Sequence, residues 1–178
     1  MKDLSLTRLW GMRLLFALLI VTILFFHLLP LDTLPRPWAG PNWILAFAFA
    51  WALRRPEFVP IWALAILFLL TDMLLQRPPG LWAALAVFAC ESLKLRARSL
   101  RDSGFASEWF TVCAMILGIV LAYRFALMIT FSPLPSLGLM LFEMIATMLA
   151  YPAAVAISYG LMGVRKAGPG DFDTLGGR

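Results

Sequence analysis

Apolar runs recur along almost the whole chain, and only short polar breaks separate them. These runs predict six membrane-spanning helices, because a helix needs about 20 apolar residues to cross the hydrocarbon core. The expected spans are about 10–31, 42–53, 59–75, 81–93, 109–131 and 136–162. Together they form one transmembrane domain over residues 1–166. The polar, glycine-rich segment 167–178 is expected to be a disordered cytoplasmic tail.

The second and fourth spans are short for a bilayer. A helix of about 12 residues rises only about 18 Å, whereas the hydrocarbon core is roughly 30 Å thick. Span 42–53 either crosses, with Trp38 and Trp43 anchoring an outward extension of the helix, or enters the membrane halfway. Span 81–93 can continue as a helix toward Leu100 if its basic side chains reach along the helix to the interface.

Composition agrees with a membrane protein. The chain has 178 residues, of which 62% are hydrophobic and 14% charged, and its mean hydropathy is +0.86. A soluble domain of this length needs more charge on its surface. The net charge of +5 does not indicate nucleic acid, because the basic residues lie where apolar runs end. Cys90 and Cys113 lie inside apolar runs and are expected to be buried free thiols.

The basic residues also predict the orientation. If the N-terminus is inside, twelve of the fifteen basic residues lie in inner segments and only Arg36 and Arg77 in outer ones. The positive-inside rule favours this arrangement, and omitting span 42–53 would move the basic segment 94–101 outside. The expected fold is therefore an all-α membrane protein, a compact bundle of six transmembrane helices with both termini in the cytoplasm.

Four polar side chains are predicted in the outer half of the bilayer: His27, Asp72, Arg124 and Glu143. An unpaired charge at membrane depth costs about 2.5–3.5 kcal/mol or more, so partners are expected. The last two spans are joined by a short loop and should be antiparallel neighbours, which predicts an Arg124–Glu143 ion pair. Asp72 is expected at the outer rim, where it caps the turn at Pro78–Gly80 or meets Arg77. Because all four groups lie in one leaflet, the sequence favours a structural or partner-facing role over a proton pathway.

Small residues at four-residue spacing predict close helix packing, either within the chain or with a partner. They are Ala46, Ala48, Ala50 and Ala52 in the second span, Gly118 and Ala122 in the fifth, and Ala146, Ala150 and Ala154 in the sixth. Pro152 should kink the sixth span. The proline also frees the carbonyl of Met148, which then needs a substitute donor.

Catalytic and metal-binding motifs are absent from the sequence. There is one histidine, and no HExxH, GxSxG, P-loop, GxGxxG or CxxC pattern occurs. A Gly-Pro-Gly-Asp in the tail is similar to the GxGD of intramembrane aspartyl proteases, but it is predicted to lie outside the membrane. We therefore expect no enzymatic activity, no cofactor and no metal.

Residues 41–102 show a family resemblance. A proline and a short alanine-rich span lead to the basic break Arg54-Arg55, and the next span ends in Asp72 before the turn that contains Pro79, Gly80 and Leu81. This order resembles the rod-shape-determining membrane protein family MreD, in its alphaproteobacterial form. Size and span number agree over nearly the whole chain, and residues 51–101 are the most specific stretch. Typical members have a glycine upstream of the aspartate, whereas Phe68 and its neighbours occupy that region here, which puts a close helix contact there in doubt.

The resemblance implies a multi-pass inner-membrane scaffold of the cell-wall elongation machinery. It would bind MreC and work with MreB, RodA and a class B penicillin-binding protein, in contact with membrane lipids and not with nucleic acid. Asp72, Pro79, Gly80 and Leu81 would be its marked positions, with structural or partner-facing roles. The alternative is transport, because MreD-like chains are similar in topology to the S-components of energy-coupling-factor vitamin transporters, and the four polar residues would then line an outward cavity. Against this, the first span has Ala17 as its only alanine and lacks the Ala-x-x-x-Ala face with which S-components dock.

Overall fold

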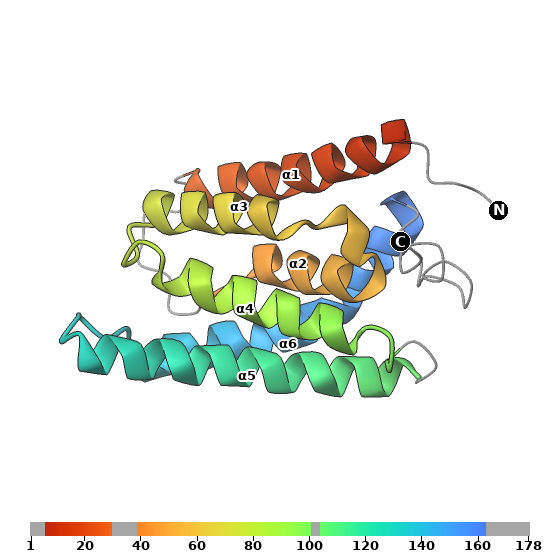
Figure 1. The fold of residues 1–178 in the computed structure, drawn as a ribbon. Helices are drawn as coiled ribbons and strands as arrows, with labels where there is room; N and C mark the ends of the chain where they lie inside the picture. The colour runs from red at the N-terminus through yellow and green to blue at the C-terminus, as the bar shows by residue number, and fades with distance from the viewer. Residues whose placement is uncertain (1–5, 30–38, 101–103, 163–178) are drawn as a thin grey trace.

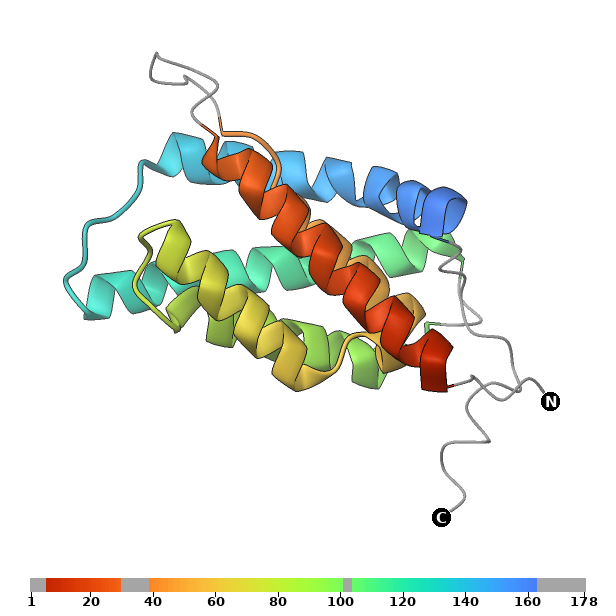
Figure 2. The same cartoon turned by 90° about the horizontal axis from the view of Figure 1, so that it is seen from above.

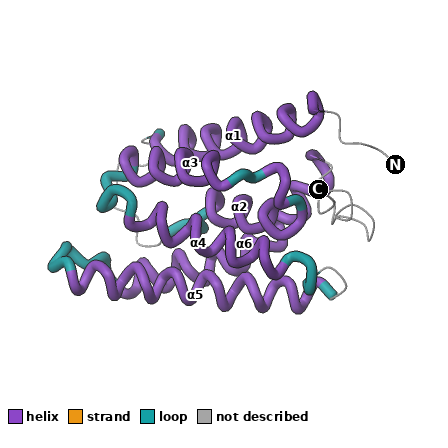
Figure 3. Tube along the Cα trace, viewed as in Figure 1, coloured by secondary structure: helices purple, strands orange, loops and turns teal. Residues whose placement is uncertain are grey.

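The computed structural model describes residues 6–29, 39–100 and 104–162, and this part of the chain is helical (Figure 3). The elements are α1 (Leu6–Leu28), α2 (Trp43–Arg54), the 3-10 turn η1 (Pro56–Phe58), α3 (Ile61–Leu74), α4 (Leu81–Arg96), α5 (Phe105–Ile129) and α6 (Leu137–Met162). The predicted spans agree with these helices to within a few residues. The largest differences are earlier starts of α1 and α5 and an extension of α4 to Arg96. The predicted tail at 167–178 lies outside the described residues.

Successive helices run in opposite directions (Figure 1). One end of the bundle holds the start of α1, the end of α6, and the α2–α3 and α4–α5 connections. We call it the basic end, because it carries Arg54, Arg55, Lys94, Arg96 and Arg98. The opposite end holds the α3–α4 and α5–α6 turns, and we call it the turn end. Seen from above, α1 crosses the bundle diagonally (Figure 2).

The helices differ in length and exposure. Three of them, α1, α5 and α6 over Leu137–Gly160, are long and apolar enough to cross a membrane, whereas α2 and α3 are shorter apolar helices. Bulky apolar side chains are exposed on the outside of the bundle, among them Leu18 on α1, Ile66 on α3, Leu121 on α5 and Leu149 on α6. A helical membrane bundle accounts for an apolar exterior of this kind, since lipid tails accept such side chains.

Helix α2 forms the centre of the bundle. Every residue from 44 to 53 is buried, and Ala46, Ala48, Ala50 and Ala52 have no exposed surface. The helix packs against α4, α6 and α1. A helix that is apolar all round is expected to be enclosed, and small side chains allow its neighbours to approach closely. The four alanines of the second span therefore serve contacts within the chain.

The other two small-residue faces have different outcomes. In α6, Ala150 and Ala154 are buried and Ala146 is half-buried, so this face packs inside the bundle. In α5, Gly118 is exposed, and a Cβ added there would meet no atom within 4 Å. Gly118 therefore makes no close helix contact in the described part of the chain, and Ala122 is half-buried.

Pro152 lies within α6 and leaves the carbonyl of Met148 without its donor in the helix. The indole Nε1 of Trp109 donates to the Met148 carbonyl oxygen over 2.9 Å. Trp109 is therefore the substitute donor that the sequence requires, and its hydrogen bond joins α5 to α6.

Candidate functional site

Asp72 joins the end of α3 to the start of α4. Its side chain is 0% exposed, and Oδ2 accepts hydrogen bonds from the backbone N–H of Gly80 (3.1 Å) and of Ala83 (3.0 Å). Gly80 is the N-cap of α4 and has φ 85°, a left-handed conformation that favours glycine. Glycine has no side chain to cap the helix, so Asp72 supplies the acceptor from the preceding helix. Of the two predicted roles, the hydrogen bonds show the cap, and the side chain is buried beside the α3–α4 turn.

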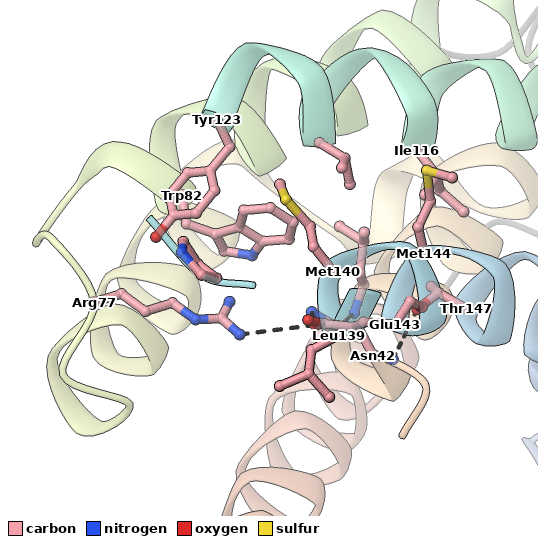
Figure 4. Close-up of a pocket in the computed structure, with 13 residues that line it drawn as sticks. Asn42, Arg77, Trp82, Ile116, Tyr123, Leu139, Met140, Glu143, Met144 and Thr147 are labelled. Atoms are coloured by element: carbon pink, nitrogen blue, oxygen red, sulfur yellow. Dashed lines mark hydrogen bonds and ion pairs between the residues drawn. The ribbon is translucent and has the colours of Figure 1, made fainter. Parts of the chain in front are cut away.

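The end of α3 directs Arg77 away from the helix. Gln76 has φ 53°, and the N–H groups of Gln76 and Arg77 donate to the carbonyls of Met73 (3.4 Å) and Asp72 (3.0 Å). These two bonds and the left-handed residue define a Schellman motif. The turn that follows projects the Arg77 side chain toward α6 (Figure 4).

A cavity of about 170 Å³ lies near the turn end, between α2, α4, α5 and α6. Its lining comprises Asn42, Leu45, Arg77, Trp82, Ile116, Val120, Tyr123, Pro135, Leu139, Met140, Glu143, Met144 and Thr147. We call it the turn-end pocket (Figure 4). Of the residues predicted as a polar cluster, only Glu143 lines it.

Hydrogen bonds hold the Glu143 side of this pocket. Asn42 Nδ2 donates to Glu143 Oε1 (3.2 Å), and the Asn42 backbone N–H donates to Thr147 Oγ1 (2.9 Å). Asn42 is also the N-cap of α2, where its side-chain oxygen accepts from Leu45 N–H (3.1 Å). The start of α2 is thereby fixed against α6.

Arg77 approaches Glu143 from the other side. Its Nη2 lies 3.8 Å from Glu143 Oε1, and the two side chains are 24% and 34% exposed. The guanidinium carbon lies 5.2 Å from the ring centre of Trp82, a cation–π geometry. Trp82 in turn packs edge-on against Tyr123, with 5.2 Å between ring centres.

The predicted Arg124–Glu143 pair is wrong. Arg124 Nη1 donates to the Pro135 carbonyl (3.3 Å) and lies 3.7 Å from the Met140 sulfur, while Glu143 pairs with Arg77. Two helices joined by a short loop are neighbours, but the loop does not fix their rotation. The α3–α4 turn brings a guanidinium to Glu143 from a residue that the sequence placed in an outer loop.

His27 is also separate from the other three groups. It is exposed on the last turn of α1, and within the described residues no hydrogen bond or ion pair joins it to Asp72, Arg124 or Glu143. The four polar residues therefore do not form one cluster. His27 is exposed, Asp72 caps α4, Arg124 donates to a loop carbonyl, and Glu143 lines the turn-end pocket.

The sequence analysis missed a buried polar network at the basic end. Glu108, 1% exposed, accepts from Arg54 Nε (3.2 Å) and Nη2 (3.4 Å) and from the Tyr151 hydroxyl (2.8 Å). These residues belong to α5, α2 and α6, so the network ties three helices together. A tyrosine inside an apolar span was the available signal, because a buried hydroxyl requires a partner.

The thiols of Cys90 and Cys113 are free, the first buried and the second half-buried. Among the described residues, no three His, Cys, Asp or Glu side chains lie close enough to hold a metal ion. The class that the fold defines is an all-helical bundle with three helices fit to cross a membrane. Comparison of the chain with protein-family models, with curated proteins and with solved structures gives no match.

Proposed function

We propose that the protein is a non-catalytic, multi-pass scaffold of the bacterial inner membrane that serves the cell-wall elongation machinery as MreD does. Both termini lie in the cytoplasm, and all six helices belong to the transmembrane domain. Its main partner is MreC, and it works with MreB, RodA and a class B penicillin-binding protein. The proposal begins from the resemblance of residues 41–102 to the MreD family.

The Asp72 cap is the observation that carries the proposal. The positions that the resemblance marks, Asp72, Pro79, Gly80 and Leu81, lie in one unit that closes the α3–α4 turn. One carboxyl oxygen of Asp72 is engaged by two backbone N–H groups, and the side chain is fully buried. Such a motif supports a fixed shape at the turn end, whereas a reaction centre requires groups that reach a substrate.

The exterior of the bundle offers the surfaces for partners. Packing against other transmembrane helices needs apolar or small side chains on the outside. Exposed positions of this kind occur on α1, α3, α4, α5 and α6, whereas residues 44–53 of α2 are buried. Partners of the scaffold therefore bind on the outer helices.

Site-specific crosslinking tests the proposal. In a background with Cys90→Ala and Cys113→Ala, single cysteines are introduced and crosslinked to MreC of the same organism. The positions are Leu18, Ile66, Leu121 and Leu149, with the fully buried Ala48 as control. At least one outer position should crosslink at high yield, and MreC should co-purify in mild detergent at fixed stoichiometry. Yields that nowhere exceed that of the control position, without co-purification, would contradict the scaffold.

A carrier similar to an S-component is the second candidate, and the turn-end pocket is the observation in its favour. Its volume of about 170 Å³ is below the roughly 300–1,000 Å³ of ordinary small-molecule sites, so a vitamin-sized ligand does not fit without rearrangement. A stoichiometric vitamin-sized molecule in the purified protein would support the carrier over the scaffold.

A further inference from the structure

The turn-end pocket contains opposite charges that are only loosely paired. Arg77 and Glu143 lie 3.8 Å apart, beyond hydrogen-bond distance, and both side chains are partly exposed. A pair of this kind contributes little to stability. Glu143 Oε1 accepts from Asn42, while no hydrogen bond engages Oε2 or the guanidinium of Arg77 in the described part of the chain. Both charged groups therefore have capacity for a ligand.

Tyr123 adds a polar group that has no protein partner. The residue is 8% exposed and lines the pocket, yet among the described residues its hydroxyl makes no hydrogen bond. The hydroxyl oxygen keeps accessible surface, so there is open space beside it. A phenol that lines the same pocket as a guanidinium can donate to a group that accepts hydrogen bonds, such as a phosphate oxygen.

The pocket combines charged and apolar lining. Arg77 and Glu143 supply opposite charges, while the apolar surface comes from residues such as Leu45, Ile116 and Met140. A phospholipid combines a charged head with an apolar part in the same way. The volume of about 170 Å³ is close to the roughly 150 Å³ of a cavity that binds benzene, so it admits a headgroup rather than a whole lipid.

We propose that the turn-end pocket binds a phosphate ester that carries a primary ammonium group, the chemistry of an ethanolamine phospholipid head. Arg77 and Tyr123 donate to the phosphate oxygens. Glu143 accepts from the ammonium group through Oε2, and its other oxygen stays on Asn42. The inference does not rest on the scaffold function, because a scaffold or a carrier accommodates the same ligand.

Binding is measured on the full chain in detergent, as the shift in melting temperature and by native mass spectrometry. Phosphatidylethanolamine should bind more tightly than phosphatidylglycerol, which lacks the ammonium group, and than phosphatidylcholine, whose methylated ammonium cannot donate a hydrogen bond. Free phosphoethanolamine distinguishes the two sources of this chemistry. Competition with the lipid at similar concentration indicates that the head alone is recognised, whereas binding of the lipid without competition indicates the membrane lipid as ligand.

Two conservative variants test the assigned contacts. Tyr123→Phe removes only the hydroxyl and should weaken phosphatidylethanolamine binding about tenfold, as expected for one hydrogen bond to a charged group. Glu143→Gln should abolish the preference over phosphatidylglycerol. Tyr159→Phe and Glu91→Gln are the matched controls, because both lie outside the pocket, and each should bind like the parent chain.

The melting temperature without lipid shows whether each variant is folded. Equal binding of the three lipids by the parent chain would overturn the inference. A preference for phosphatidylethanolamine over phosphatidylglycerol that survives in Glu143→Gln, or unchanged binding in Tyr123→Phe, would overturn it as well.

Discussion

Removal of the Asp72 carboxyl should destabilise the α3–α4 connection. In Asp72→Ala, the N–H groups of Gly80 and Ala83 lose the acceptor that now lies 3.1 and 3.0 Å away. A lost cap costs about 0.5–2 kcal/mol, and each unsatisfied buried donor about 1–3 kcal/mol, so we expect a loss of about 2–5 kcal/mol. At 2–4 °C per kcal/mol, this corresponds to roughly 4–20 °C in melting temperature for a chain of this size.

Asp72→Asn separates the hydrogen bonds from the carboxyl group. The amide oxygen can take the place of Oδ2 and keep both bonds, but the amide nitrogen then occupies the site of Oδ1, which is buried without a partner in the described structure. We expect a loss of about 1–2 kcal/mol, smaller than for Asp72→Ala. Ser92→Ala is the control, because the Ser92 hydroxyl only returns to the Phe88 carbonyl on an exposed face of α4.

Reversible unfolding in mixed micelles measures the free energy of unfolding of each variant, and hydrogen exchange shows which backbone amides lose protection. Exchange at Gly80 and Ala83 should accelerate in Asp72→Ala, while amides at the basic end stay protected. If Asp72→Ala is as stable as the control variant, or if exchange rises everywhere except at these two amides, the capping argument is refuted.

Two further perturbations test contacts between helices. Trp109→Phe should cost about 1–2 kcal/mol in the same unfolding assay, because the Met148 carbonyl loses its donor while the aromatic packing remains; stability equal to the parent chain would contradict this. A double-mutant cycle of Arg77→Gln with Glu143→Gln should give a coupling energy of up to about 1 kcal/mol, as expected for a partly exposed pair. The cycle of Arg124→Gln with Glu143→Gln should give no coupling energy beyond the error of the measurement, because Arg124 binds the Pro135 carbonyl instead. A larger coupling energy for Arg124 with Glu143 than for Arg77 with Glu143 would instead support the Arg124–Glu143 pair that the sequence predicts.

Much of the fold could be predicted from the sequence because lipid imposes strong constraints. Apolar runs and proline breaks delimit the helices, and the alanine pattern of α2 predicts close packing. The Asp72 cap was predictable too, since a carboxyl before a Pro-Pro-Gly turn has few other roles. The donor to the Met148 carbonyl followed from Pro152, although only the structure identifies it as Trp109.

The pairing of charges could not be predicted in the same way. It depends on rotations of helices about their axes, which loop length does not determine. Arg77 reaches Glu143 because Gln76 adopts a left-handed conformation, and nothing in the residue type requires this. Glu108 lies at the predicted start of a span, where a charge needs no explanation, so its burial between Arg54 and Tyr151 became visible only once three helices were assembled.

The two ends of the bundle differ in how their polar groups are held, and this difference bears on function. At the basic end, Glu108 is fully enclosed and its hydrogen bonds connect three helices, so movement there would expose an unpaired charge. At the turn end, the Arg77–Glu143 contact is long and partly exposed, and it borders a cavity. Regions with loose contacts and exposed polar groups have the lowest local stability. A ligand or partner that engages the Arg77–Glu143 pair therefore meets side chains that can adjust on an α3–α4 turn fixed by Asp72, while the network at the basic end joins α2, α5 and α6.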